Sequence, residues 1–198
     1  MTERPRPEKG HPTDAGETDR ERDESDDAGD DRAESEGNTT VADELTHTTD
    51  AGDVDMVDVG AKPNTARRAI ARGEIALAEE TIDAIREDQV GKGNVLATAR
   101  IGAIGAVKHT WETIPMCHHI PISNVETDFE VDENRIVLTV TVETTGKTGC
   151  EMEALEGVMT GLNTVWDMVK AVEKDEDGQY PNTGIENVRV VEKEKRSL

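Results

Sequence analysis

The longest amphipathic pattern in the chain covers residues 146–175, and every other segment has to be fitted around it. The segment reads GKTGCEMEALEGVMTGLNTVWDMVKAVEKD. Its larger apolar side chains recur at the three- and four-residue spacing of a single helix face. They are Met152, Leu155, Met159, Leu162, Val165, Trp166 and Val169. We therefore expect one long helix that buries this stripe.

The start of this helix carries turn and capping signals. Gly146 and Gly149 bracket a turn, and Thr148 and Glu151 stand three residues apart. That spacing is the capping box, in which two side chains accept hydrogen bonds from otherwise unpaired amides at a helix start. We therefore expect an ordered entry into the helix.

Charged side chains lie off the apolar stripe and allow two interpretations. They are Glu153, Asp167, Lys170 and Lys174. They can form an ordinary solvated face, with lysines that suit the helix C-terminus. They can instead hold an acid–base pair and a phosphate contact, because Asp167 and Lys170 share one face. The spacing leaves both interpretations open.

The first part of the chain differs in composition from the rest. Residues 1–40 are rich in Asp, Glu, Gly, Pro, Thr and Ser and have almost no apolar side chains. Such a segment cannot bury enough surface to offset the entropy of ordering it. Of the 198 residues, we expect 1–43 to form a disordered acidic tail and 44–198 to form one domain.

The chain is strongly acidic, with a formal net charge of −22. This charge opposes unaided binding to nucleic acid or to an anionic membrane. It is typical of organisms that keep molar salt inside the cell and indicates a haloarchaeal source. No apolar run could span a membrane and no apolar leader stands near the start, so we expect a soluble, cytoplasmic protein. Against this background, a lysine or arginine in a motif is a better candidate for anion binding.

Shorter patterns supply the other elements. Alternating polar and apolar residues predict four strands. They cover residues 65–73, 122–131, 135–144 and 185–191. Residues 132–134 predict a hairpin turn. Helical spacing predicts one helix within residues 74–88. It predicts a second helix that starts after the cap Asn94 and ends near residues 111–114. Helices on one side of an antiparallel sheet make an α+β sandwich, which is the fold class we expect.

A short segment fenced by prolines, PMCHHIP at residues 115–121, places Cys117, His118 and His119 side by side. Neighbouring residues rarely bind one metal together, and no second Cys/His cluster exists in the chain, so a zinc site is disfavoured. A nucleophilic Cys–His pair needs facing side chains, which adjacency does not provide. A pocket wall is the simplest interpretation. Cys117 and Cys150 match no zinc spacing and are expected to be free thiols.

Five strings in the chain together resemble the MoaC family, the cyclic pyranopterin monophosphate synthases of molybdenum cofactor synthesis. They are MVDVGAK, KGNVLATARI, IPMCHHI, GKTGCEMEAL and WDMVKAV, in the family's order and spacing, and the resemblance covers about residues 45–193. It implies a ferredoxin-like antiparallel sheet with helices packed on one face. It also implies a lyase that converts 3′,8-cyclo-7,8-dihydro-GTP to cyclic pyranopterin monophosphate with release of pyrophosphate.

The resemblance further implies how the enzyme works and assembles. The family uses no redox cofactor, and magnesium enters only as a possible companion of pyrophosphate. Its members are homohexamers, trimers of dimers, whose pockets lie at subunit interfaces. Apart from the small-molecule substrate and further copies of the chain, no nucleic acid or membrane partner is expected.

Residue by residue, the resemblance assigns catalytic roles to Asp167, Lys170 and Lys92. It assigns substrate binding to Met116, Cys117, His118, Glu151, Met152, Glu153, Asp58, Arg67 and Lys193, and no metal ligand. Lys193 aligns with a lysine of the family, but the glycines that follow it there are missing here. His119 stands where many relatives carry proline and receives no role.

Two other functions remain as hypotheses. A metal-dependent hydrolase could use His118, His119, Glu151 and Glu153, and would lose activity to a chelator. A non-catalytic assembly module could use the charged helix face to bind a partner, and would release no pyrophosphate. Incubation with the cyclised GTP intermediate separates both from the synthase.

Overall fold

The structure, a computed structural model, describes residues 54–198. The predicted acidic tail over residues 1–43 and the predicted domain start at residue 44 lie outside this range. No helix of the described part is long and apolar enough to cross a membrane.

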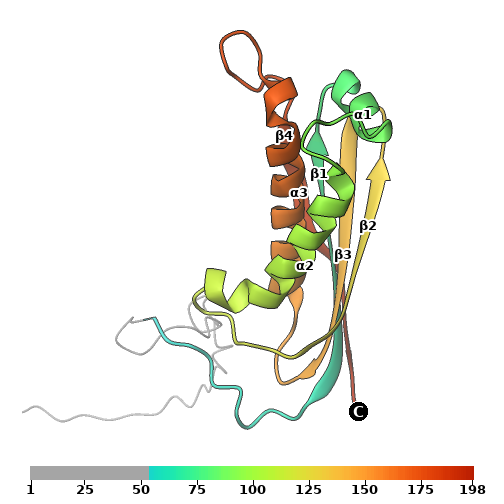
Figure 1. The fold of residues 1–198 in the computed structure, drawn as a ribbon. Helices are drawn as coiled ribbons and strands as arrows, with labels where there is room; N and C mark the ends of the chain where they lie inside the picture. The colour runs from blue at the N-terminus through green and yellow to red at the C-terminus, as the bar shows by residue number, and fades with distance from the viewer. Residues whose placement is uncertain (1–53) are drawn as a thin grey trace, which may run out of the picture. The chain divides into compact units, whose positions relative to one another are not determined.

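A four-stranded antiparallel sheet carries all three helices on one face (Figure 1). The elements in chain order are β1 (Thr65–Ala76), α1 (Glu79–Arg86), α2 (Val95–Thr113), β2 (Ile122–Val131), β3 (Arg135–Gly146), α3 (Glu151–Glu173) and β4 (Gly184–Arg196). The strand order is β2-β3-β1-β4. This is the split β-α-β arrangement of a ferredoxin-like fold, so the predicted fold class is confirmed.

The core lies between the sheet and the pair α2 and α3. On β3, Ile136, Leu138, Val140 and Val142 are fully buried at every second position, as a strand with one covered face requires. Facing them, α3 contributes a buried row of side chains. Its members are Ala154, Val158, Leu162, Val165 and Val169. The long helix therefore holds the two layers together, as its pattern predicted.

The buried face of α3 differs in part from the predicted stripe. Met152 and Met159 are 41% and 46% exposed, whereas Ala154 and Val158 are fully buried. Small residues explain the difference, because they let a helix approach its neighbours most closely. The core therefore forms against the side of α3 that carries them, and the two methionines fall at its edge.

Two predicted boundaries were wrong. The helix α3 starts at Glu151 with Cys150 as N-cap and no side-chain cap, so the predicted capping box does not form. Residues 74–76 belong to β1 and not to a helix, because Ala76 still pairs with Arg135 of β3. The hairpin and the cap of α2 are confirmed: the Asn94 side chain accepts a hydrogen bond from the Ala97 amide at 2.8 Å.

Two glycines of α3 are expected to be intolerant of even one added methyl group. A Cβ at Gly157 would lie 2.7 Å from Val107 Cγ2, and a Cβ at Gly161 would overlap Leu138 Cδ2. We expect Gly157→Ala and Gly161→Ala each to lower the free energy of unfolding by about 1–3 kcal/mol, the usual cost of overpacking. Urea unfolding at high salt measures this.

Gly105 of α2 provides the matched control. No atom lies within 4 Å of the position its Cβ would take. Gly105→Ala should therefore keep or raise stability, by up to about 1 kcal/mol from helix propensity alone. If Gly161→Ala proves as stable as Gly105→Ala, the close packing of α3 at Gly161, against Leu138 of β3 and Ala103 of α2, is contradicted.

Candidate active site

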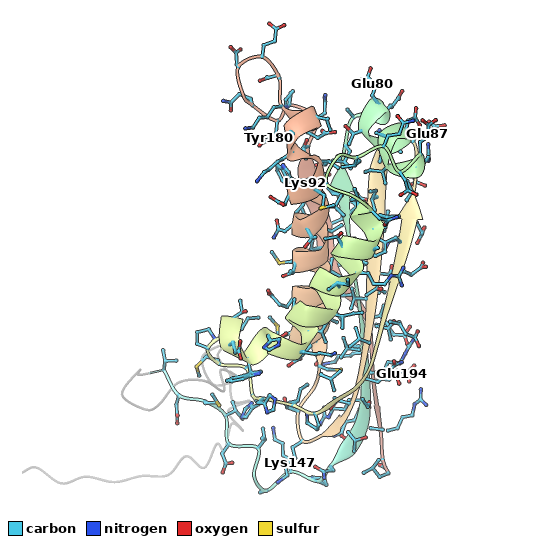
Figure 2. The ribbon with its side chains drawn as sticks, in the orientation of Figure 1. Glu80, Glu87, Lys92, Lys147, Tyr180 and Glu194 are labelled. Atoms are coloured by element: carbon cyan, nitrogen blue, oxygen red, sulfur yellow. The ribbon has the colours of Figure 1, made fainter. Side chains whose placement is uncertain are left out.

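Three of the predicted site residues meet near the C-terminal end of α3. Figure 2 labels one of them, Lys92, beside this helix. Asp167 and Lys170 lie one turn apart on α3, and Lys92 reaches them from the loop before α2. The Lys170 Nζ lies 2.7 Å from Asp167 Oδ1, and the Lys92 Nζ lies 3.0 Å from Asp167 Oδ2. Lys92 also donates to the Asp167 backbone carbonyl. We call these three residues the lysine–aspartate cluster.

The loop that presents Lys92 is shaped by its neighbours. Gly93 has φ of 103°, a left-handed conformation that favours glycine, and its amide donates to the Val90 carbonyl at 2.9 Å. Asn94 then caps α2 directly. Lys92 is therefore fixed between a tight turn and a helix start, and its side chain is directed toward α3.

The electrostatics of the lysine–aspartate cluster favour an anionic ligand. Hydrogen bonds from Lys170 and then Lys92 hold the pKa of the Asp167 carboxyl below its ordinary value. The hydrogen bond to Asp167 raises the pKa of Lys170. Two ammonium groups thus share one carboxylate, which leaves one net positive charge in a chain of net charge −22. All three side chains are 43–58% exposed, so they face solvent within one chain.

A second group of predicted residues surrounds a cavity of about 430 Å³ at the opposite end of α3. It includes six of the nine predicted substrate-binding residues. They are Met116, Cys117, His118, Glu151, Met152 and Glu153. The segment after α2 and the entry to α3 supply these side chains, and Val57, Val59 and Lys62 complete the wall. We call this the helix-entry pocket, and the predicted pocket-wall interpretation of residues 115–121 fits it.

Glu153 is the most perturbed carboxyl group of the helix-entry pocket. It is 5% exposed, and burial, with repulsion from Glu151, raises its pKa to about 7. Burial and then the charge of Glu153 also raise the pKa of the Cys117 thiol. Of the two interpretations of the charged face, the solvated one is wrong for Glu153. A signal for its burial existed, because Glu153, Gly157 and Gly161 recur at four-residue spacing on one helix face.

Cations border the helix-entry pocket on the side of the sheet. The Lys193 Nζ lies 3.1 Å from Glu151 Oε1, and Arg67 Nη2 donates to the Lys147 carbonyl at 3.2 Å. The Arg67 Nε is buried without a hydrogen-bond partner among the residues that the structure describes. Burial raises the pKa of Glu151, but its own backbone amide, Lys193 and Arg67 outweigh burial and leave the pKa below its ordinary value.

Asp58 takes a different place from the other predicted residues. Its Oδ1 accepts a hydrogen bond from the Gly60 amide at 2.7 Å and does not line the cavity, although Val57 and Val59 do. Lys62 of the same segment lines the cavity and was missed. The signal was available, since Lys62 ends the MVDVGAK string and is a cation in an acidic chain.

The two cysteines are free thiols, as predicted. Cys150 is buried, and burial, with the charges of Glu153 and Glu151, raises its pKa to about 12. A thiol of this kind is a poor nucleophile, because the thiolate is the reactive form. Cys150 therefore contributes packing at the start of α3.

Within residues 54–198, no three His, Cys, Asp or Glu side chains are grouped so that they could hold a metal ion. The His119 ring packs edge-on against Trp111 with centroids 5.2 Å apart. The four residues named for a metal-dependent hydrolase, His118, His119, Glu151 and Glu153, do not form such a group.

The lysine–aspartate cluster and the helix-entry pocket are far apart within one chain. Glu153 and Asp167 lie fourteen positions apart on the same straight helix. At about 1.5 Å of rise per residue, this places them about 21 Å apart along the axis. One chain therefore presents two separate groups of predicted site residues at opposite ends of α3.

A pH-dependent stability effect is expected from Glu153. Its pKa rises from an ordinary 4.5 to about 7 on folding, so the folded chain holds this proton more tightly than the unfolded chain. The associated stability is fully present below pH 4.5 and is lost as pH rises to about 7. Glu153→Gln removes this dependence. Between pH 4.5 and pH 8, the stability of the variant relative to wild type should therefore rise by about 2–3 kcal/mol.

Denaturant unfolding at several pH values and constant high salt measures the change. Glu133→Gln, in the exposed hairpin turn, provides the control and should show no comparable trend. A Glu153→Gln difference that stays constant from pH 4.5 to pH 8 would contradict the burial of a protonated carboxyl group.

Comparison with known proteins yields a family and close relatives. The family model described as "MoaC family" matches residues 56–196. A "Probable cyclic pyranopterin monophosphate synthase" of Halobacterium salinarum is 74% identical over 153 residues, covering 77% of this chain and 94% of the relative. Proteins of the same name from Natronomonas pharaonis and Methanoregula boonei are 71% and 57% identical, covering 78% and 77% of this chain and 97% of each relative.

Proposed function

This chain belongs to the MoaC family, and from that premise we propose that it is a cyclic pyranopterin monophosphate synthase of molybdenum cofactor biosynthesis. The reaction converts 3′,8-cyclo-7,8-dihydro-GTP to cyclic pyranopterin monophosphate and releases pyrophosphate, which makes the enzyme a lyase. The observation that carries the proposal is the convergence of Lys92 and Lys170 on the two oxygens of Asp167. An ordinary solvated face would not need a lysine from another segment.

The residue types suit a triphosphate substrate. If the two groups are half-sites of one site, Lys92 and Lys170 supply positive charge at one, and Arg67, Lys62 and Lys193 supply it around the other. Ammonium groups and guanidinium groups are the usual protein partners of phosphate oxygens. In a chain this acidic, five cations gathered at two locations support the binding of an anion there.

Proton carriers lie at both half-sites. The reaction opens and closes rings, so it needs groups that donate and accept protons near the ribose and the purine. Glu153 titrates near neutral pH, which suits a group that does both. Lys170 is held protonated beside Asp167, which suits a proton donor. No redox change occurs, so the proposed mechanism relies on these side chains, with magnesium as a companion of the released pyrophosphate.

The distance between the half-sites leads us to propose a shared site. A nucleotide cannot reach both Glu153 and Asp167 of one chain when about 21 Å of helix separates them. A two-fold contact would bring the lysine–aspartate cluster of one chain to the helix-entry pocket of another. By the same symmetry, the cluster of the second chain would meet the pocket of the first, so each dimer would hold two such sites. Three such dimers would make the homohexamer that the family resemblance implies.

The net charge of the chain and the organisms of its relatives indicate the salt concentration at which the protein works. The net charge of −22 and the haloarchaeal relatives support a protein that functions in the high-salt cytoplasm of a haloarchaeon. At 1 M salt, the repulsion between acidic surfaces is screened beyond about 3 Å. Close contact between subunits then becomes possible. The half-sites would then assemble only in concentrated salt.

Incubation of the purified chain with the cyclised GTP intermediate tests the proposed function. We expect one pyrophosphate for each cyclic pterin formed, with no loss of activity after the protein is treated with a zinc-selective chelator. A protein that binds no intermediate and releases no pyrophosphate would be an assembly module. Stoichiometric zinc, with activity lost to the chelator, would instead favour the hydrolase.

A further inference from the structure

One wall of the helix-entry pocket comes from a segment that belongs to no helix or strand of the fold. We call this segment, residues 57–62, the strap. Its Val57 and Val59 are half-buried and line the cavity, whereas the residues that alternate with them are exposed. Lys62, at the end of the strap, also lines the cavity. The strap therefore presents two apolar side chains and one cation to a ligand in the pocket.

The strap has a turn of its own but only one hydrogen bond to the rest of the fold. The Asp58 Oδ1 accepts a hydrogen bond from the Gly60 amide at 2.7 Å, and the Lys62 amide donates to the Val59 carbonyl at 3.1 Å. Both bonds stay within the strap. Among the hydrogen bonds of residues 54–198, a single one joins the strap to another segment: the Lys147 ammonium group donates to the Gly60 carbonyl.

Lys147 itself is held in place by the sheet. Figure 2 labels it at the lower end of the sheet. It follows Gly146, the last residue of β3, which pairs with Thr65 at the start of β1. The Arg67 Nη2 donates to the Lys147 backbone carbonyl at 3.2 Å. Lys147 does not line the cavity, although Gly149 does, so it acts on the pocket through the strap.

The strap should open readily without the Lys147 bond. Four of its six residues are exposed, so little buried apolar surface holds it in place. A hydrogen bond from an ammonium group is stronger than one between neutral groups. Loss of the bond should therefore shift the strap toward open conformations while the sheet and the helices stay folded.

We propose that Lys147 is a positioning residue that holds the strap across the helix-entry pocket and so completes the pocket wall for the substrate. This inference rests on the proposed function for its kinetic consequence. A wall that contacts substrate and transition state alike changes affinity and not the chemical step. The two competing roles of Lys147 are direct contact with substrate phosphates and support of the fold alone.

Millisecond hydrogen–deuterium exchange of the substrate-free, full-length protein tests the strap without turnover. Lys147→Met keeps the stem of the side chain and removes the ammonium group. We expect it to speed exchange of the strap amides about threefold or more and to leave α2, α3 and the melting temperature unchanged. Lys147→Arg keeps N–H donors and should retain wild-type exchange. Lys108→Met, which removes an exposed lysine of α2, is the matched control and should also exchange like wild type.

Steady-state kinetics with the cyclised GTP intermediate tests the consequence for the pocket. We expect Lys147→Met to raise KM about three- to tenfold with kcat within about twofold, because the closed strap that binds substrate is less populated. Lys147→Arg and Lys108→Met should keep the wild-type KM.

Three results would overturn the proposal. Unchanged strap exchange in Lys147→Met, together with a raised KM, would show direct contact with the substrate. Faster strap exchange with a wild-type KM would remove the role of the strap in the pocket. Faster exchange throughout the sheet and helices would show support of the fold alone. If wild type makes no pterin, the proposed function fails, and the exchange measurement still decides whether Lys147 holds the strap.

Discussion

Replacing Asp167 by Asn is expected to lower turnover by about a hundredfold or more, the scale of one acid–base group. The carboxylate is the shared partner of Lys92 and Lys170, and their hydrogen bonds keep it ionised. Asn has nearly the same shape but cannot neutralise two ammonium groups. Intermediate should still bind, because the site loses a negative charge and gains no bulk.

The fold should survive this change and the two lysine changes. Asp167 is 58% exposed, and exposed ion pairs contribute little to stability. Lys92→Ala and Lys170→Ala should each reduce turnover on the same scale and also weaken intermediate binding, because each removes a cation. Single-turnover rates, binding affinity and thermal unfolding of each variant measure these effects.

Lys108→Ala provides the matched control, because it removes an exposed lysine from α2 outside both half-sites. It should retain wild-type turnover and binding. If the three cluster variants are folded and turn over like this control, Asp167, Lys92 and Lys170 are not the catalytic set.

Local signals predicted most of the fold. Alternation predicted the hairpin of β2 and β3, and the Asn94 cap predicted the start of α2. The failures came where tertiary contacts decide. β1 continues to Ala76 because β3 is there to pair with it, and α3 starts late because the chain is still in β3 at Gly146. The pairing of β1 with β3, which decides both boundaries, is not visible in the local sequence pattern.

The candidate site was predicted through family resemblance, and the structure shows why spacing could not supply it. Lys92 and Asp167 are 75 positions apart, so only the packing of α2 on α3 brings them together. The spacing left the burial of Glu153 undecided because a charge allows a solvated face, although the glycines at positions 157 and 161 indicated a covered one. The separation of the half-sites, by contrast, could be read from helix rise alone.

The largest gain of activity is expected from combining two inactive variants. Asp167→Asn damages the lysine–aspartate cluster, and Glu153→Gln damages the helix-entry pocket, with little change of shape in either. If each site joins half-sites of two chains, a mixed dimer has one site with both lesions and one intact site. Random pairing then gives mixed dimers in half of the cases, so the mixture should recover about a quarter of wild-type activity.

Co-expression of the two variants, followed by turnover measurement at high salt, tests the shared site most directly. The control pairs wild type with a chain carrying both substitutions: a shared site predicts about a quarter of full activity, and a site within one chain predicts about half. For the two single variants, we predict recovery to about a quarter of wild type. A mixture that stays as inactive as its two components, with the control at half, would contradict the shared site.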